Sequence, residues 1–490
     1  MKDHANSGVL SRLLCPVDLT KGEPWRVIIR YSLPIMLSYL LQQIYTLTDS
    51  IICGQVLSAE QVAGVNDTNP LTFIILQFAF GCTSGFGVLT AKCVGSGDER
   101  GVRRSFAAQL WLLGAIGVVL TVGSVLLLPW LLGVINVCPE NPIVYRAAYD
   151  YCLVIFLGIF AQMGYNLVCG ILRAYGDPVT PLLFLVVSTV LNIGLDLLLL
   201  VPLHMGPIGA AVATVTAQLI SMLGCGAYML IRYPALRIRR EDWRVTRHEL
   251  FEHFKCGVPL GLQFSVLAIG LIAMQAQFVR FDLTADGTMV PGTPAQIGSA
   301  AANKLINLLM APFNGLGSGL LGFNAQNLGS GRHDRVRTGT LSAIGIMLII
   351  SVACTAIGLL LSIDGAYQHI FLSEEKITAD TIRFGNTLLY VDMLPYAVLG
   401  FLIVVRGGVQ GVLRTGYVLG AGIVELLARV LICAFIPQLL AGGAISASAP
   451  LASFAAVCAS DPGAWLTASL LLLIPLFRDI LRRSRARTLE

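Results

Sequence analysis

Charged residues are scarce in this sequence, and their scarcity excludes an ordinary soluble protein. Asp, Glu, Lys and Arg make up 12% of the 490 residues, whereas hydrophobic residues make up 56%. Soluble domains carry about 25% charged residues. No stretch between the apolar segments is long enough to form a soluble domain with its own core. The chain is therefore expected to lie in a membrane.

The sequence also lacks the patterns that mark several other classes of protein. No glycine-rich loop ends in Lys followed by Ser or Thr, which argues against ATP-driven transport. The 12 cysteines and 6 histidines are scattered without the spacing of metal ligands. No Ser/Lys or His/Asp constellation points to an enzyme, and no aromatic and basic strand pattern points to nucleic acid binding. Met1–Gly22 is polar and has no apolar core, so no cleaved signal peptide is expected.

The sequence does have long apolar segments of helical length. A helix that spans a bilayer needs about 20 mostly apolar residues. Twelve segments meet this requirement: 27–53, 64–92, 105–132, 145–172, 178–201, 206–231, 252–281, 296–326, 338–363, 381–411, 416–440 and 461–481. The sequence therefore predicts an all-α polytopic membrane protein with twelve transmembrane helices.

The twelve segments form two similar halves of six. In the first half Gly95–Gly97 reads Gly-Ser-Gly before a charged stretch, and Gly170–Arg173 follows as Gly-Ile-Leu-Arg. In the second half Gly329–Gly331 and Gly411–Arg414 repeat both landmarks in the same order. Duplicated helical halves in a membrane are typical of secondary transporters, whose site lies in the cleft between the halves. We expect two six-helix repeated lobes around a central cleft.

The placement of positive charge predicts the orientation of these lobes. Lys and Arg gather at both ends of the chain and in the loop at 232–250, whereas the loop at 282–295 carries Asp282 and Asp286. Positively charged loops stay on the cytoplasmic side. Both termini and the 232–250 loop are therefore expected on the cytoplasmic side of the membrane, and the 282–295 loop on the outer side. The predicted organisation is a cytoplasmic segment at 1–26, an N-terminal lobe at 27–232, a cytoplasmic linker at 233–251, a C-terminal lobe at 252–482 and a cytoplasmic tail at 483–490.

Polar residues at one depth of the first half predict an ion site. An acid at a helix centre costs about 2.5–3.5 kcal/mol on insertion scales, so one that remains there usually faces a polar interior. Asp196 precedes the outer link at 202–207, Thr214 follows it at a similar depth, and Asn192 shares a helix face with Asp196. Asp49 lies near the outer end of the first helix, within reach of the same depth. Two carboxylates, an amide oxygen and a hydroxyl suit Na⁺ or a proton shared by the carboxylates. A plainer alternative has Asp49 capping a helix end and Asp196 bonded only to Asn192.

Four stretches resemble the multidrug and toxic compound extrusion (MATE) family over about residues 25–480. They read "LPIMLSYLLQQIYTLTDSIICG", "GILRAYGDPVTPLLFLVVSTVLNIGLDLLL", "GPIGAAVATVTAQ" and "APFNGLGSGLLGFNAQNLGSG". The resemblance implies a V-shaped antiporter that exchanges Na⁺ or H⁺ for organic, often cationic, compounds. The family's first-lobe cation site matches Asp49, Asn192, Asp196 and Thr214 position by position.

The second half departs from the branch of the family thought to bind Na⁺ through acids in the seventh and tenth spans. The seventh span, 252–281, offers Gln263 and Gln275, and the tenth span, 381–411, places Arg406 where an acid is expected. The choice between the two ions therefore leans towards H⁺. Glu425 and Arg429 lie four residues apart on one helix face and are expected to form a structural polar pair, with a substrate site as the alternative.

Polar residues within the apolar segments are candidates for the wall of the substrate cleft, although each could instead form a hydrogen bond between helices. They are Gln42, Gln43, Gln162, Asn166, Gln263, Gln275, Asn303 and Asn307. None of them identifies a substrate.

The sequence therefore predicts a secondary-active multidrug exporter of the plasma membrane, the inner membrane in a bacterium. It would act as a monomer among membrane lipids, exchange H⁺ or Na⁺ for small organic compounds, and need no cofactor beyond the coupling ion. A flippase for lipid-linked saccharides is the alternative, and a line of cationic residues through the cleft would favour it. Lys304 and Arg429 are the candidates for such a line. A polytopic membrane enzyme is a more distant alternative.

Overall fold

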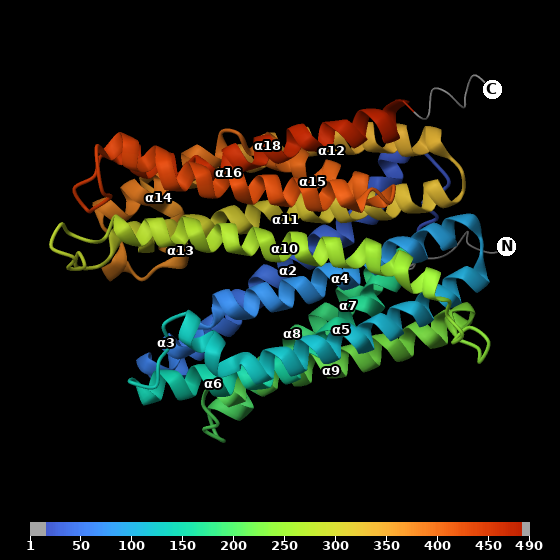
Figure 1. Ribbon diagram of the computed structural model, residues 1–490, viewed down its shortest axis with the longest axis horizontal. Helices are drawn as coiled ribbons and strands as arrows, with labels where there is room; N and C mark the ends of the chain where they lie inside the picture. Colours follow the sequence, from blue (N-terminus) through green and yellow to red (C-terminus); the bar gives the residue numbers. More distant parts are fainter. Residues whose placement is uncertain (1–15, 483–490) are drawn as a thin grey trace.

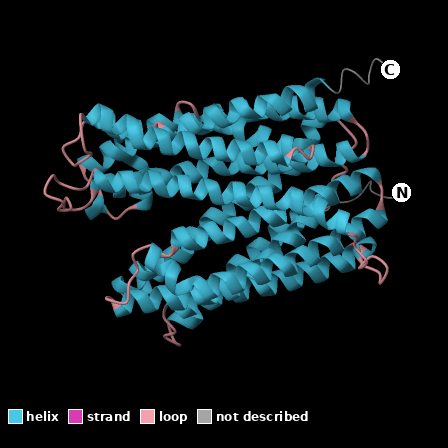
Figure 2. Ribbon diagram, in the orientation of Figure 1, coloured by secondary structure: helices cyan, strands magenta, loops and turns pink. Residues whose placement is uncertain are grey.

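The chain is helical almost throughout the part that the computed structural model describes, residues 16–482. The first 15 residues of the predicted N-terminal segment and the predicted tail at 483–490 lie outside the described residues. Short loops join the helices at the two ends of the molecule (Figure 2). The extended pairing within residues 16–482 is a single bridge between Leu283 and Met289.

The helices follow one another in two groups. The first group is α2 (Pro24–Val56), α3 (Ala59–Asp67), α4 (Asn69–Ser96), α5 (Glu99–Val134), α6 (Pro142–Leu157), α7 (Ile159–Ala174), α8 (Val179–Leu200) and α9 (Pro207–Arg232). The second group is α10 (Arg247–Arg280), α11 (Pro294–Gly329), α12 (His333–Leu361), α13 (Ala366–Phe371), α14 (Ala379–Met393), α15 (Tyr396–Gly411), α16 (Thr415–Ala441), α17 (Leu451–Cys458) and α18 (Ser460–Pro475). Short 3₁₀ turns at Pro234–Leu236, Ile363–Gly365 and Glu374–Lys376 and a π-helical end at Leu476–Arg482 complete the chain.

Twelve spans are confirmed, although two of them are bent. Ten helices, the last running from Leu451 to Arg482, are each long and apolar enough to cross a membrane. The pairs α6–α7 and α14–α15 each make one further span, with bends of 44° and 54°. The predicted spans at 145–172 and 381–411 are present, and each is divided into two helices, at Gly158 and at Pro395. The last span also begins about ten residues before the predicted 461.

The segment before the second span holds a separate helix, α3, whose last residues the prediction assigned to that span. In α3 the hydroxyl of Ser58 accepts a hydrogen bond from the backbone of Gln61, whose side chain accepts one from the backbone of Ser58. This reciprocal capping box starts a short helix of its own. The second span then begins at Asn69, beyond the predicted start at 64.

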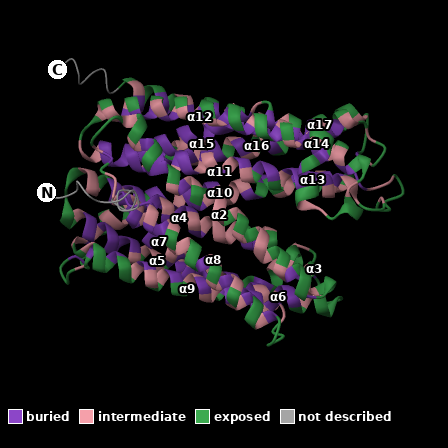
Figure 3. Cartoon of the chain, turned by 180° about the vertical axis from the view of Figure 1, so that it is seen from behind, coloured by how far each residue is buried: buried purple, intermediate pink, exposed green. Residues whose placement is uncertain are grey.

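The helices form two bundles that meet at one end and splay apart at the other. Helices α2 to α9 form one bundle and α10 to α18 the other, and α2 begins and the last span ends where the bundles meet (Figure 1). Large apolar side chains face outwards, including Leu126 at 74% exposure and Ile349 at 73%. An outer surface of this kind suits lipid and would be costly in water. Buried residues lie mainly between the helices, as on α11 (Figure 3).

At the joined end the two bundles touch through glycines. A Cβ atom on Gly81 of α4 would lie 2.6 Å from the Cα of Gly261 on α10, and one on Gly95 would overlap the carbonyl oxygen of Gln326 on α11. Such contacts let the helix backbones approach closely, as small residues do in membranes. The first part of α2 takes part in the same contact, because Tyr31 belongs to the hydrophobic core of the second bundle.

The two Gly-Ser-Gly landmarks are turns at this joined end. Gly97 and Gly331 have φ angles of 71° and 74°, a left-handed conformation that glycine adopts without strain. Each glycine ends one long helix, α4 or α11, just before the next begins. Both landmarks are therefore tight turns between neighbouring helices.

The basic loop and the acidic loop lie at opposite ends of the molecule (Figure 1). The loop after α9 is held at the joined end by an ion pair of 2.9 Å between Arg103 and Asp242. Burial alone would raise the pKa of Asp242, but hydrogen bonds from the backbone of Arg239 and from Arg103 hold it below its usual value. The loop between α10 and α11 lies at the splayed end. This separation of charge is the one that the positive-inside rule requires.

Candidate functional site

Four predicted ion-site residues come from three helices of the first bundle. Asp49 lies on α2, Asn192 and Asp196 on α8, and Thr214 on α9. The buried face of α8 carries Ser188, Asn192 and Asp196 in steps of one helical turn, while its other faces are apolar and exposed. The polar face of α8 therefore lies against α2 and α9.

The structure brings these side chains together. The amide nitrogen of Asn192 donates to the hydroxyl of Thr214 at 3.4 Å. Asp49 of α2 and Asp196 of α8 are neighbours in this cluster. Tyr45, one turn before Asp49 on α2, donates its hydroxyl to Thr214 at 3.5 Å. Tyr45 was not predicted as a site residue, although its spacing from Asp49 places both on one face of α2.

Oxygen atoms at this cluster have no hydrogen-bond donor. Within residues 16–482, one oxygen of Asp49, the amide oxygen of Asn192 and both carboxyl oxygens of Asp196 are buried and receive no hydrogen bond. Asp196 is completely buried. Ionised carboxyl groups only accept hydrogen bonds, so two of them in contact repel unless a proton or a cation lies between them. The chemistry of these atoms fits a proton or a hard cation such as Na⁺.

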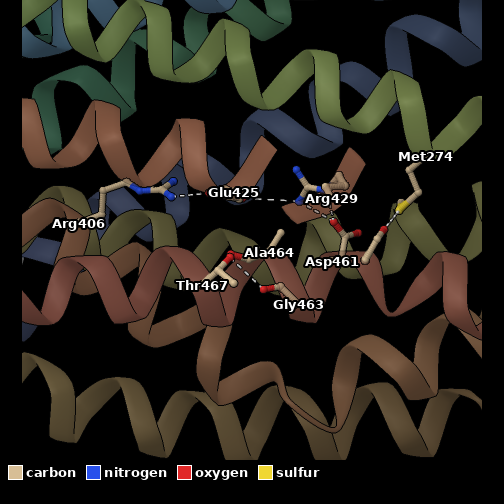
Figure 4. A network of polar contacts seen from close by, with 9 residues as sticks. Met274, Arg406, Glu425, Arg429, Asp461, Gly463, Ala464 and Thr467 are labelled. Carbon is tan, nitrogen blue, oxygen red and sulfur yellow. Dashed lines mark hydrogen bonds and ion pairs between the residues drawn. The ribbon is translucent and has the colours of Figure 1, made fainter. Parts of the chain in front are cut away.

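The second bundle contains a network of buried charges in place of a similar oxygen cluster (Figure 4). Arg406 on α15 bonds Glu425 at 2.6 Å, and Arg429 bonds Asp461 on α18 at 2.5 Å. Glu425 and Arg429 on α16 lie 3.6 Å apart, so the predicted polar pair is confirmed. Its partners on other helices were not predicted, since spacing along one helix gives no information about its neighbours.

The second bundle also holds a buried acid in the span at 381–411 that was not predicted as a site residue. Asp392 lies at the end of α14, before the bend, and is 1% exposed. One of its carboxyl oxygens has no donor among the described residues. Arg406 lies in the same span but beyond the bend, on α15. The second lobe therefore holds more buried acids than the sequences of its seventh and tenth spans predict.

A cavity of about 160 Å³ lies between the bundles, towards their joined end. Helices α2, α4, α7 and α8 line it from the first bundle, and α10, α11 and α15 from the second. Of the eight predicted cleft residues, Gln42 and Asn166 line this cavity. The other six lie outside its wall: Gln43, Gln162, Gln263, Gln275, Asn303 and Asn307.

The cavity wall includes residues that were not among the predicted cleft residues. Gln410 reaches it from α15 and Arg173 from α7. Phe80 of α4 and Phe264 of α10 meet edge to face across the two bundles, with ring centroids 5.7 Å apart. Aromatic rings and a few polar groups in one concave site are the usual lining of a site for small organic molecules.

Two bundles of six spans, a cavity between them and a buried oxygen cluster in one bundle define a membrane transporter. The family described as MatE matches residues 34–198 and 297–436 of this chain. The chain therefore belongs to the multidrug and toxic compound extrusion (MATE) family of transporters.

Relatives and solved structures agree with this assignment. The chain is 27% identical over 322 residues to the probable multidrug resistance protein YpnP of Bacillus subtilis, covering 65% of this chain and 68% of that protein. It is 24% identical over 333 residues to an FAD transporter of Shewanella oneidensis, covering 66% of this chain and 70% of that protein. A MATE crystal structure in complex with MaL6 has the same fold, with a TM-score of 0.82 at 22% identity, covering 94% of this chain and 98% of that one.

Proposed function

We propose that this transporter is a secondary-active exporter that exchanges H⁺ or Na⁺ for organic compounds by alternating access. It acts as a monomer in the plasma membrane, with both termini in the cytoplasm. The observation that carries the proposal is the cluster of buried oxygens on Asp49, Asn192 and Asp196 without donors. Such a cluster is stable when it holds a positive charge.

Helix α2 connects the ion cluster to the contact between the bundles. The part of α2 nearer the splayed end carries Asp49. The part nearer the joined end packs against α11, where Ser32 faces Gly319 and Met36 faces Gly315. Pro34 lies inside α2 between these contacts. A cation or proton at Asp49 removes the repulsion between α2 and α8. The resulting shift of α2 alters its contact with α11.

Binding at the cluster thereby favours one arrangement of the bundles over the other. The shift in population is limited by the difference in the ion's affinity for the two arrangements. The same Asp49 and Asp196 serve both ions, so H⁺ and Na⁺ compete. The buried Asp392 is a candidate for a further proton site in the second bundle. The buried acids Glu425 and Asp461 are bound by arginines, so they offer no comparable cluster of free oxygens among the described residues.

Transport by the purified protein in liposomes tests this proposal. A fluorescent organic dye should leave its compartment faster when an opposing Na⁺ or pH gradient is imposed, and ATP without a gradient should have no effect. Dye movement that depends on ATP, or that ignores both gradients, would contradict the proposal. Empty liposomes with the same gradients measure passive leak.

A flippase for lipid-linked saccharides is less well supported. That reading needs a line of cationic side chains through the cleft, and Arg429 is instead bound by Asp461 and Glu425. Lys304 does not line the cavity. The names of the relatives include both multidrug resistance and FAD transport, so membership of the family alone leaves the charge of the substrate open.

A further inference from the structure

The cavity between the bundles is lined by an arginine, Arg173, that has no counter-ion among the described residues. Arg173 lies in the last turn of α7, half-buried, and lines the cavity. No carboxylate of the described residues forms an ion pair with it, and its buried Nε atom has no acceptor. The acid nearest to it in sequence, Asp177, is already bound by Thr180 and Tyr233.

The equivalent arginine of the second half shows that the lack of a partner is particular to Arg173. Arg414 ends the same Gly-x-Leu-Arg landmark and forms an ion pair of 2.9 Å with Asp479. The buried Arg429 and Arg103 are likewise bound by carboxylates. Leaving a half-buried cation without a counter-ion costs free energy unless a ligand supplies the negative charge.

A second donor without an acceptor faces the same cavity from the other bundle. Gln410 on α15 is 4% exposed, lines the cavity, and its amide nitrogen has no acceptor among the described residues. Hydrogen-bond donors therefore reach the cavity from both bundles. A bound group with oxygen acceptors would satisfy both of them at once.

The rest of the cavity wall contains no negative charge. Arg173 is the one charged residue among the side chains that line the cavity, and the acids Asp49 and Asp196 lie outside the wall. An organic cation would meet a like charge there and no counter-ion. Phe80 and Phe264 supply aromatic surface from both bundles. The cavity volume of about 160 Å³ suits one part of a substrate, such as an acidic group and the ring that carries it.

We propose that this cavity binds an aromatic organic anion, with its carboxylate or sulfonate group held by Arg173 and Gln410. A guanidinium group pairs with planar oxyanions through two parallel hydrogen bonds, which favours these groups over neutral ones. Because the two donors belong to different bundles, the anion binds where the bundles meet. This inference rests on the proposed export function and names the charge of its substrate.

Binding of two dyes with one ring system tests the proposal directly. Fluorescein is an anion and rhodamine 123 a cation on the same xanthene scaffold, so their comparison isolates charge. Fluorescence anisotropy with the purified full-length protein should show that fluorescein binds more tightly than rhodamine 123. Arg173→Gln should weaken fluorescein binding by about tenfold to a hundredfold, the scale of a charged hydrogen bond, while Arg173→Lys should restore part of it.

Two further variants make the test independent of the folding of Arg173→Gln. Gln410→Glu keeps the shape of the side chain and adds an acid, so it should abolish fluorescein binding while improving that of rhodamine 123. Arg146→Gln removes an exposed arginine outside the cavity and should leave both affinities unchanged. Thermal unfolding of each variant shows whether the fold is retained.

Three results would overturn the inference. They are tighter binding of rhodamine 123 than of fluorescein by the wild type, no fluorescein binding by the wild type, and unchanged fluorescein binding in a folded Arg173→Gln variant. Gradient-driven transport of rhodamine 123 alone would reject the anion site and leave the proposed antiport intact. Loss of gradient dependence for both dyes would instead reject the antiport.

Discussion

Replacing Asp49 with Asn should nearly abolish ion-driven efflux while leaving the amount of folded protein unchanged. Asn keeps the size of the side chain but removes the negative charge that binds the coupling ion, and its amide can donate to Asp196 without any ion. The gradient-driven rate should fall by about tenfold or more, the scale of a coupling free energy. Dye efflux from liposomes under an imposed Na⁺ or pH gradient measures this rate.

Two matched variants show whether the loss belongs to this site. Thr214→Ala removes one neutral oxygen of the cluster and should reduce the rate by about twofold to tenfold. Asp286→Asn removes an exposed acid of the loop between α10 and α11 and should have no effect. An Asp49→Asn protein that transports at the wild-type rate would show that Asp49 does not bind the coupling ion.

Replacing Gly95 or Gly329 with Val should stop transport by preventing the bundles from meeting. A Cβ at Gly95 would overlap the carbonyl oxygen of Gln326, and one at Gly329 would overlap that of Lys92. Both neighbours are backbone atoms, which cannot move without shifting a whole helix. The arrangement seen here, with the bundles joined at one end, should therefore be lost and efflux should fall to the level of passive leak.

A distance between the bundles tests this prediction apart from transport. Spin labels at Glu99→Cys on α5 and Asp334→Cys on α12, on a background without other cysteines, report the separation at the joined end. The labels should lie farther apart in the Gly95→Val protein than in the wild type. Gly114→Val, at a helical glycine with open space around it, is the control and should change neither distance nor efflux. Full efflux by Gly95→Val would mean that the transport cycle does not need this close contact.

The number of spans and the duplicated halves could be predicted because lipid imposes a minimum length of apolar helix. The bends could not, since a proline alone does not decide whether a span breaks: Pro34, Pro259 and Pro312 lie inside helices that continue without a break. A break within a span depends on how the two parts pack against other helices, and the sequence of one span does not contain that information. The separate α3 had a local signal in its capping box at Ser58 and Gln61.

The ion cluster was predictable to the extent that depth in the membrane decides which side chains can meet. Asn192, Asp196 and Thr214 flank a short link between neighbouring helices, so their depths follow from counting residues. The role of the second bundle was harder to predict. Arg406 and Asp461 meet the helix that carries Arg429 from two other helices, and pairing between helices has no periodic signal. The lack of an ion-pair partner for Arg173 could not be predicted either, because it depends on which side chains of other helices surround this arginine.

Sodium binding at two pH values, in the wild type and in Asp196→Asn, tests the central claim most directly. The claim is that Asp49 and Asp196 form one site at which H⁺ and Na⁺ compete. Binding of radioactive sodium to the purified protein should be weaker at mildly acidic than at mildly alkaline pH, because protons occupy the same carboxylates. It should be lost in Asp196→Asn at both pH values. Sodium affinity that ignores both the pH and the Asp196 substitution would contradict a shared carboxylate site.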